Sequence, residues 1–405
     1  FASERPLQKL SDPSAVDGVI QGFVSSGAFP YVYVHLEDLD GKVFYDHAAV
    51  NDDLLDGMQI NSDSWIRIWS MSKFVTISVA LDLVEDGILS LDDPVVKYIP
   101  EFAALQVALS ASGGDLISQQ DKDKACPLRH VPVEHSMTVR DLLNHKAGFY
   151  YPWTGMGCLD GQWTEANLLL ASNSDELIER LAGLPLINQP GADYNYSTAT
   201  TVLGLVAERA SGLSLTQLVQ DRMTGPLGIQ GLQYGLPEGA ILPPRFTGTD
   251  GHARRATAQE MAVQTPDYSP ASRLYLGGEG MVATADGYAD FARMLLRRGE
   301  LNGQRVLEQE TVEEIASPHT LLDNSFGYNG YNLWVSNGKL SDGSQGPAPL
   351  WIGGGYEGTH FWIDPKREFV GVIMTQILDV PESGNDRDEK IRQAIYAQLE
   401  EVAAE

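Results

Sequence analysis

The sequence predicts an α/β fold in which strands from both ends of the chain form one sheet and a mostly helical region is inserted between them. Residues 31–36 alternate like a half-buried strand, and further strand patterns occur at 42–45, 331–335, 360–363 and 369–374. Helical apolar spacing dominates the middle of the chain, at 139–144, 174–181, 200–210 and 215–223. We therefore expect a sheet domain from residues 1–70 and 270–405, and a mostly helical domain from residues 71–269.

Other helices and turns complete this layout. Val16 to Phe23 has helical apolar spacing, and a helix is expected from Ser72 to near Gly87. The pattern of residues 386–402 predicts a charged amphipathic helix. Asp40-Gly41 supplies a hairpin turn between the first two strands. Because ligand sites tend to form between domains, the site is expected in the cleft between these two.

The charge of the chain restricts its partners. It has 55 acidic and 28 basic residues, a formal net charge of −27. A surface this acidic repels nucleic acid and anionic membranes, so neither is expected as a partner. No stretch approaches the ~20 uninterrupted apolar residues of a membrane helix, so no membrane span is expected. The oligomeric state does not follow from the sequence.

The cysteines and histidines give no sign of a metal site. Cys126 and Cys158 are the only cysteines; they could form one disulfide, but not a four-thiolate zinc site. His130 and His135 lie in a loop without a His-Glu-x-x-His pattern, and neither a metal nor another cofactor is expected. The opening residues Phe1-Ala2-Ser3 are compatible with signal-peptide removal and export to the periplasm or medium, with a cytoplasmic location as the alternative.

The first candidate catalytic element is Ser70-Met71-Ser72-Lys73, a Ser-x-x-Lys motif at the start of an apolar helix. Residues three apart share one face of a helix, so Ser70 and Lys73 can meet. A serine hydroxyl needs a nearby base to become a nucleophile. A lysine can be that base if burial and nearby positive charge lower its pKa. In the alternative interpretation, Ser70 or Ser72 caps the helix and Lys73 is a surface charge.

The second element is Tyr196-Ser197-Thr198, which follows the Pro190-Gly191 turn and precedes a helix. Tyr196 could relay a proton if a neighbouring lysine lowers its pKa from the usual ~10. The alternative is a half-buried tyrosine with its hydroxyl in water.

The third element is Trp351-Ile352-Gly353-Gly354-Gly355, just before an expected strand. Glycines allow a strand edge to approach a substrate, so that backbone N–H groups can face an oxyanion. A glycine-rich turn is the alternative. Gly353-x-Gly355-x-x-Gly358 formally matches a dinucleotide fingerprint, but a strand rather than a helix follows, which excludes that interpretation.

In their order and separation, these three elements resemble the superfamily of serine β-lactamases, penicillin-binding proteins and family VIII carboxylesterases. Two further stretches, Met137–Gly148 and Gly277–Asp286, resemble recurrent segments of the same superfamily, and the resemblance extends from about Asp17 to Thr375. It implies a β-lactamase-like fold: an antiparallel sheet flanked by helices, with an inserted mostly helical domain and the active site in the cleft between them.

The resemblance also implies roles for individual residues. Ser70 would attack the acyl carbonyl, and Lys73 and Tyr196 would share the proton transfers. Backbone N–H groups of Ser70 and of the strand near Gly353 and Gly354 would hold the oxyanion. Water would then release an acyl-Ser70 ester, without any cofactor.

Three departures from the family pattern bear on the substrate. The usual Tyr-x-Asn ends here in Thr198, and the usual cation-capable residue of the third motif is here Trp351, as in the esterase branch. A tryptophan suits an uncharged acyl or alcohol portion better than a β-lactam carboxylate. The third departure is a long excursion, residues 103–136, which either rims the cleft or forms a peripheral loop.

These observations predict a serine carboxylesterase that hydrolyses short to medium acyl esters, with acyl transfer to alcohols as an additional activity. A β-lactamase, a D-amino-acid peptidase or another amide hydrolase of the same fold is the alternative, and a non-catalytic acylatable sensor is a third hypothesis. No Gly-x-Ser-x-Gly occurs, which argues against a nucleophile elbow. Further aromatic candidates for substrate contact are Trp153, Tyr328, Trp334 and Tyr356.

Overall fold

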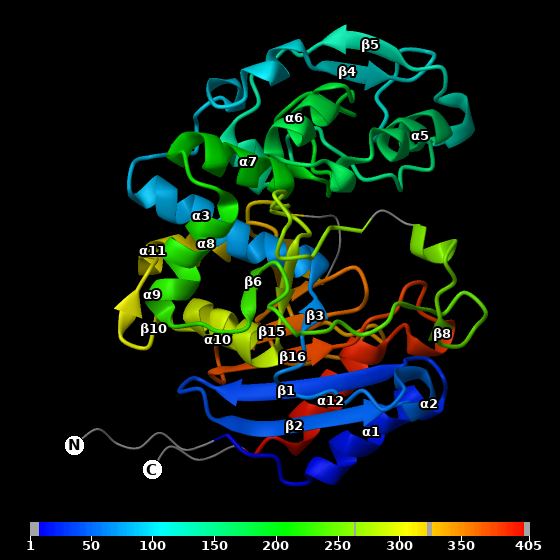
Figure 1. Ribbon diagram of the computed structural model, residues 1–405, viewed down its shortest axis with the longest axis vertical. Coiled ribbons are helices and arrows are strands. Elements are labelled where there is room, and N and C mark those ends of the chain that lie inside the picture. The colour runs from blue at the N-terminus through cyan, green and yellow to red at the C-terminus, as the bar shows by residue number, and fades with distance from the viewer. Residues whose placement is uncertain (1–7, 263–264, 322–325, 401–405) are drawn as a thin grey trace. The chain divides into compact units, whose positions relative to one another are not determined.

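The computed structural model describes residues 8–262, 265–321 and 326–400 (Figure 1). The N-terminal residues that bear on export lie outside these ranges. The chain forms two compact units. Unit 1 comprises Phe1–Met71, Pro226–Val263 and Val282–Glu405, and unit 2 comprises Ser72–Gly225 and Gln264–Met281. The segment 226–262, expected in the helical domain, belongs to unit 1 with the sheet, and the segment 270–281, expected in the sheet domain, belongs to unit 2.

Unit 1 is built on a seven-stranded sheet in which every neighbouring pair is antiparallel. In spatial order its strands are β12 (Gly327–Asn329), β13 (Trp334–Ser336), β14 (Leu350–Gly354), β15 (His360–Asp364), β16 (Phe369–Met374), β1 (Tyr31–Asp38) and β2 (Val43–Val50). The first strands of the chain thus pair directly with the last, which confirms the predicted sheet.

One expected strand is different in the structure. The strand predicted over 331–335 is divided, because residues 330–333 form the turn between β12 and β13. Asn332 has a left-handed φ of 59°, a conformation that belongs to turns and not to a strand. The apolar residues of this turn, Tyr331 and Leu333, are fully buried, so they gave the apolar alternation of a strand without its backbone.

Helices cover both faces of this sheet. Phe361 of β15 contacts Tyr288 of α10 (Ala285–Leu296), whereas its neighbour His360 contacts Arg392 of α12 (Arg387–Gln398). Consecutive residues of a strand point to opposite faces, so α10 and α12 lie on opposite sides. Helix α1 (Pro13–Ser25) packs beside α12. The central strands β1 and β16 are consequently buried on both sides.

Unit 2 is arranged around helix α3 (Ser72–Glu85), in which 11 of 14 residues are buried. A helix that is apolar on all sides requires neighbours all round, and α3 packs against α7 (Ala199–Ser211) and α8 (Leu215–Val219). Helix α4 (Val139–Leu143) begins with a capping box between Thr138 and Asp141, which explains the Thr-Val-Arg-Asp stretch in physical terms.

The 103–136 excursion contains a small hairpin of β4 (Gln106–Leu109) and β5 (Arg129–Pro132). A disulfide between Cys126 and Cys158 joins the excursion to α5 (Gly157–Ala166), which answers a question that the sequence left open. The other helices and strands are α2 (Asp52–Leu55), β3 (Ile66–Arg67), α6 (Ser174–Ala182), α9 (Gly225–Leu227), β6 (Leu232–Tyr234), β7 (Phe246–Thr247), β8 (Arg254–Arg255), β9 (Met281–Ala283), β10 (Glu300–Leu301), β11 (Gln304–Arg305) and α11 (Gln309–Ile315).

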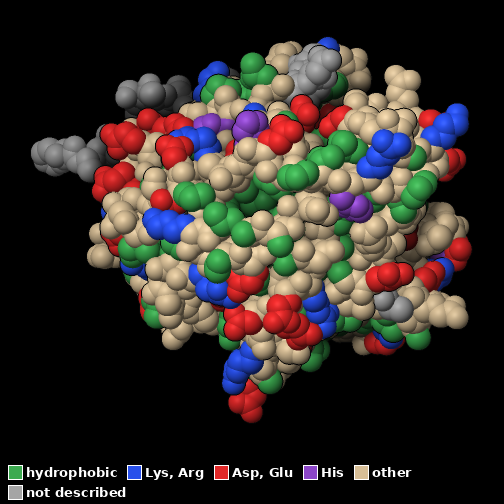
Figure 2. Space-filling view, turned by 90° about the horizontal axis from the view of Figure 1, so that it is seen from above, with side chains coloured by type: hydrophobic (Ala, Val, Ile, Leu, Met, Phe, Trp, Pro, Cys, Tyr) green, Lys and Arg blue, Asp and Glu red, His purple; other side chains and the backbone are tan. Residues whose placement is uncertain are grey.

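Within the described ranges, no helix has both the length and the apolar character needed to cross a membrane. On the face shown in Figure 2, acidic side chains are interspersed with basic and neutral ones and do not form one acidic patch.

Candidate active site

Ser70 lies in a short 3-10 turn, η1 (Trp69–Met71), which runs directly into α3. The side chain of Ser70 is half-buried. Trp69, immediately before it, has a left-handed φ of 44°, which is unusual for a bulky residue. The candidate nucleophile therefore sits at a sharp change of backbone direction, three residues before Lys73.

Lys73 is fully buried in the first turn of α3. Its Nζ donates to Tyr151 Oη at 2.9 Å and to the carbonyl oxygen of Gly278 at 3.0 Å. The same nitrogen lies 5.0 Å from the ring centroid of Tyr196 and 5.3 Å from that of Tyr151. The structure therefore excludes the alternative of an exposed surface charge, because two oxygens and two aromatic rings surround this ammonium group.

Tyr196 is half-buried in the loop that precedes α7. Its ring packs against His145 and Tyr151, with centroid distances of 4.9 and 5.5 Å. Two hydrogen bonds fix this loop to His145, which follows α4. The backbone N–H of Asn195 donates to the carbonyl of His145, and the backbone N–H of Ser197 donates to Nδ1 of the His145 ring. These contacts explain why the His145 segment accompanies the tyrosine motif.

Tyr151 and Glu279 complete this cluster, and the sequence analysis gave neither of them a role. The hydroxyl of Tyr151 donates to Glu279 Oε1 at 2.8 Å, and the other oxygen of Glu279 accepts from Thr201 at 2.7 Å. Burial, and then the charge of Glu279, raise the pKa of Tyr151 well above its usual value. Tyr151 therefore stays protonated, and it connects the ammonium of Lys73 to a buried carboxyl group.

The backbone of Gly277 and Gly278 passes very close to this cluster. A Cβ on Gly278 would lie 2.6 Å from Thr201 Oγ1 and 3.3 Å from Lys73 Nζ, and one on Gly277 would lie 2.8 Å from the carbonyl oxygen of Thr200. Only glycine allows the Gly278 carbonyl to reach the ammonium. The signal in the sequence was the Gly277–Asp286 stretch, although nothing there indicated its contact with Lys73.

In unit 1, the glycine-rich strand β14 approaches the turn that carries Ser70. Gly353 and Gly354 pair with Phe361 and His360. A Cβ on the next residue, Gly355, would lie 2.4 Å from the carbonyl oxygen of Ile68, two residues before Ser70. The backbone that packs against this turn is thus at the end of the predicted glycine segment.

The predicted substrate contacts differ in their surroundings. Trp351 is buried in β14 with the guanidinium of Arg298 5.0 Å from its ring centre. The hydroxyl of Tyr328 donates to the carbonyl of Ala316. Trp351 is therefore buried, whereas Tyr328 is half-buried, and their roles as substrate contacts remain predictions.

Other predicted contacts adjoin the catalytic candidates. Trp153 is 63% exposed and stacks on Tyr151, with ring centroids 4.9 Å apart. Tyr356 is 44% exposed and its ring meets that of Trp69 edge-on at 5.3 Å. Thr198 is buried just before α7, and Trp334 is half-buried in β13. These positions make Trp153 and Tyr356 the better candidates for substrate contact.

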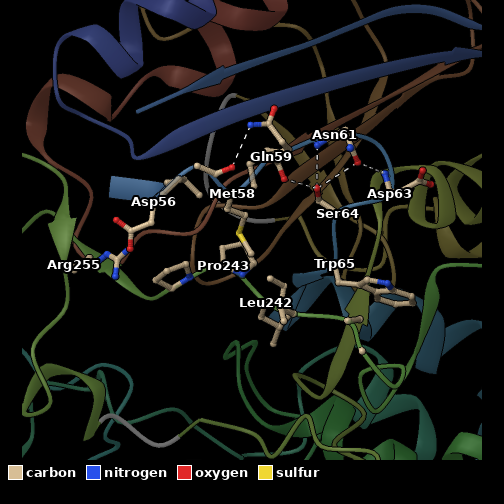
Figure 3. A pocket seen from close by; sticks show the side chains of 17 residues that line it. Asp56, Met58, Gln59, Asn61, Asp63, Ser64, Trp65, Leu242, Pro243 and Arg255 are labelled. Atoms are coloured by element: carbon tan, nitrogen blue, oxygen red, sulfur yellow. Dashed lines mark hydrogen bonds and ion pairs between the residues drawn. The ribbon is translucent and has the colours of Figure 1, made fainter. Parts of the chain in front are cut away.

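An open pocket of about 800 Å³ lies within unit 1, between the segments 55–65 and 239–244 (Figure 3). Met58, Trp65, Leu242 and Pro243 supply apolar surface, and Arg255 forms an ion pair with Asp56 at one side. The carbonyl of Pro243 accepts a hydrogen bond from Arg67 Nη1 at 3.1 Å, so the wall of this pocket contacts the strand that leads to Ser70.

Among the described residues, His35, Glu37 and Asp286 form a group with the composition of a metal site. Glu37 accepts from His35 Nε2 and from Arg293 Nε, both at 2.8 Å. A guanidinium already balances this carboxylate, so the group is explained as a hydrogen-bonded network of unit 1.

A family model described as Beta-lactamase matches residues 16–396, and the chain therefore belongs to the beta-lactamase family. The proteins compared below include an esterase and a hydrolase with acyltransferase activity, as their names state. The predicted fold and family are thereby confirmed.

Two relatives and one solved structure are similar to this chain. Protein Rv1367c of Mycobacterium tuberculosis is 30% identical over 293 residues, which cover 70% of this chain but only 66% of that protein. Lovastatin esterase of Penicillium rubens is 26% identical, over 94% of this chain and 98% of its own length. The solved structure of EstCE1, a hydrolase with promiscuous acyltransferase activity, aligns with a TM-score of 0.75 at 21% identity and covers 95% of this chain and 98% of that one.

Proposed function

We propose that this protein is a serine carboxylesterase that hydrolyses short to medium acyl esters through an acyl-Ser70 intermediate. The observation that carries the proposal is the burial of Lys73 among Tyr151, Tyr196 and the Gly278 carbonyl, three residues after Ser70. A buried lysine nitrogen that contacts a tyrosine hydroxyl, a backbone carbonyl and a second tyrosine ring supports a role in proton transfer.

In the proposed reaction, the Lys73–Tyr196 pair starts with one proton fewer than its fully protonated form, as a neutral lysine amine or a tyrosinate. Ser70 Oγ attacks the ester carbonyl and its proton passes to this pair. Backbone N–H groups of Ser70 and of the Gly353–Gly355 segment stabilise the negative oxygen of the tetrahedral intermediate. The C–O bond to the alcohol breaks, and the alcohol leaves with the proton. Water, deprotonated by the same pair, then attacks the acyl-enzyme and releases the acid. An alcohol that replaces this water yields acyl transfer.

Several features favour esters over β-lactams. Thr198 lacks the amide of the usual Tyr-x-Asn motif, and an apolar Trp351 stands where penicillin-recognising relatives have a cation-capable residue. The net charge of −27 disfavours anionic substrates at long range. The names of lovastatin esterase and EstCE1 point in the same direction. Amide hydrolysis remains the second candidate, because it uses the same nucleophile.

The test compares kcat/KM for p-nitrophenyl butyrate and for a chromogenic cephalosporin on one preparation. We expect strong turnover of the ester and little or none of the cephalosporin. Ser70→Ala is the control and should abolish both activities. Preferred turnover of the cephalosporin would support the amide hydrolase, and a single acylation of Ser70 without release would support a sensor.

A further inference from the structure

The backbone just before the candidate nucleophile is strained. Trp69 has a φ of 44°, and a bulky residue in this left-handed region costs free energy that the surrounding structure must offset. Ser70 follows it directly, so the conformation of Trp69 sets the direction of both the hydroxyl and the backbone N–H of Ser70.

A buried carboxylate holds this strained residue. Glu357 is fully buried, and its Oε2 accepts from the indole Nε1 of Trp69 and from Arg67 Nε, both at 2.8 Å. Its Oε1 accepts from Arg245 Nε at 3.1 Å. One oxygen of Glu357 thus fixes both neighbours of Ile68, Arg67 and Trp69, just before Ser70.

Glu357 is charged in this position. Burial acts to raise the pKa of Glu357, but the positive charges of Arg67 and Arg245 outweigh it and hold the pKa below its usual range. An ionised carboxylate forms shorter and stronger hydrogen bonds than a neutral acid. At neutral pH the indole N–H of Trp69 is therefore held by a full negative charge.

Because of its position in the chain, Glu357 links the end of strand β14 to the turn that carries Ser70. Glu357 lies in the tight turn that follows β14, closed by a hydrogen bond from the N–H of Gly358 to the carbonyl of Gly355 at 3.0 Å. Gly355 packs against the carbonyl of Ile68, and the ring of Tyr356 meets that of Trp69. The carboxylate therefore fastens the end of the glycine strand to the turn that carries Ser70.

We propose that Glu357 is a positioning residue that, through Trp69 and Arg67, sets the spacing between the backbone N–H of Ser70 and that of the glycine strand. These are the two donors of the oxyanion site in the proposed function, on which this inference rests. Glu357 itself does not touch the substrate. It acts on the transition state because misplaced donors weaken stabilisation of the oxyanion more than they weaken ground-state binding.

The experiment measures the rate at which a fluorophosphonate probe modifies Ser70, together with kcat and KM for p-nitrophenyl butyrate. Glu357→Gln removes the charge while keeping the shape. Trp69→Phe removes one N–H donor and keeps an aromatic ring beside Tyr356. Glu37→Gln is the matched control, because Glu37 is also buried and also accepts from an arginine Nε at 2.8 Å, but has no contact with Trp69. Thermal unfolding of each variant reports its stability.

We expect Glu357→Gln to slow modification of Ser70 and to lower kcat by ~10–100-fold, the size of effect that a displacement of about 1 Å can produce, with KM changed little. Trp69→Phe should show the same pattern to a smaller extent, whereas Glu37→Gln should react like the wild type even if its stability falls. If Glu357→Gln does not fold, Trp69→Phe decides.

Two results would overturn the inference while leaving the proposed function intact: normal kinetics in Trp69→Phe and Glu357→Gln, or equal losses in Glu357→Gln and Glu37→Gln. A wild-type protein whose Ser70 reacts with neither probe nor ester would instead contradict the proposed function, and the inference with it.

Discussion

At the scale of single residues, the burial of the Lys73 side chain depends on the hydrogen-bond acceptors around it. An ammonium group removed from water is costly unless oxygen acceptors replace the solvent. The carbonyl of Gly278 and the hydroxyl of Tyr151 are such acceptors. The hydroxyl of Tyr151 in turn donates a hydrogen bond to Glu279. Tyr151 thus determines how strongly the lysine is held and in which direction its protons point.

Tyr151 and Tyr196 can be separated by removing each hydroxyl. Tyr196→Phe should lower kcat for p-nitrophenyl butyrate by ~2–4 orders of magnitude if Tyr196 transfers a proton. Tyr151→Phe leaves that group in place but deprives Lys73 of one acceptor, so we expect a smaller loss of about tenfold and a shifted pH–rate profile. If Tyr151→Phe costs as much as Tyr196→Phe with an unchanged profile, the two roles are assigned the wrong way round.

At the scale of elements, strand β15 and helix α12 meet through a buried histidine. His360 faces Asp388, Arg387 and Arg392 of α12. Burial lowers the pKa of His360 from 6.5 to about 3, and the two arginines add to this effect against the opposing charge of Asp388. The helix therefore packs on the sheet with a neutral imidazole in between.

This contact should make folding stability depend on pH. Because the pKa of His360 is lower in the folded than in the unfolded chain, the unfolded chain binds the proton first. The contribution of His360 to the free energy of unfolding is fully present above pH 6.5. It falls by at most about 1.4 kcal/mol per pH unit as the pH decreases from 6.5 toward 3.

Urea unfolding between about pH 7.5 and about pH 4.5 measures this dependence, a window set by the ordinary range of histidine. His360→Gln is the control variant, since its amide can still accept from Arg392 but does not titrate. The free energy of unfolding should fall more steeply in the wild type than in this variant. Parallel curves for the two proteins would contradict the assignment.

The elements of the site were only partly predictable. Ser70, Lys73 and Tyr196 belong to motifs of neighbouring residues, and such motifs can be recognised in the sequence alone. Tyr151, Glu279 and Glu357 belong to no such motif: their hydrogen bonds join residues far apart in the chain, and one tyrosine or glutamate resembles another until the fold brings it to a partner. The prediction of one continuous strand over 331–335 was wrong for a related reason. Tyr331 and Leu333 are buried in a turn, and buried turn residues can produce the same sequence pattern as a strand.

At the scale of the whole molecule, the net charge of −27 opposes compaction. Like charges repel one another more strongly in the folded chain than in the expanded one. We expect the free energy of unfolding to rise when ionic strength increases from about 0.01 to about 0.1 M, which shortens the screening length from roughly 30 to roughly 10 Å. Urea unfolding in NaCl tests this, with KCl to exclude binding of a particular cation. A decrease with salt would show that attractive ion pairs dominate instead.

The sequence by itself determined the sheet formed by both chain ends and the order of the three motifs, because these depend on periodicity and local spacing. The resemblance of those motifs to a known superfamily identified the family. Only the tertiary structure decided that Cys126 joins Cys158, that Trp351 is buried, and that Gly355 and Glu357 reach the turn before Ser70. The physical reason is that hydrogen bonds, close backbone approaches and desolvation depend on distances between residues remote in the chain, which no local pattern encodes.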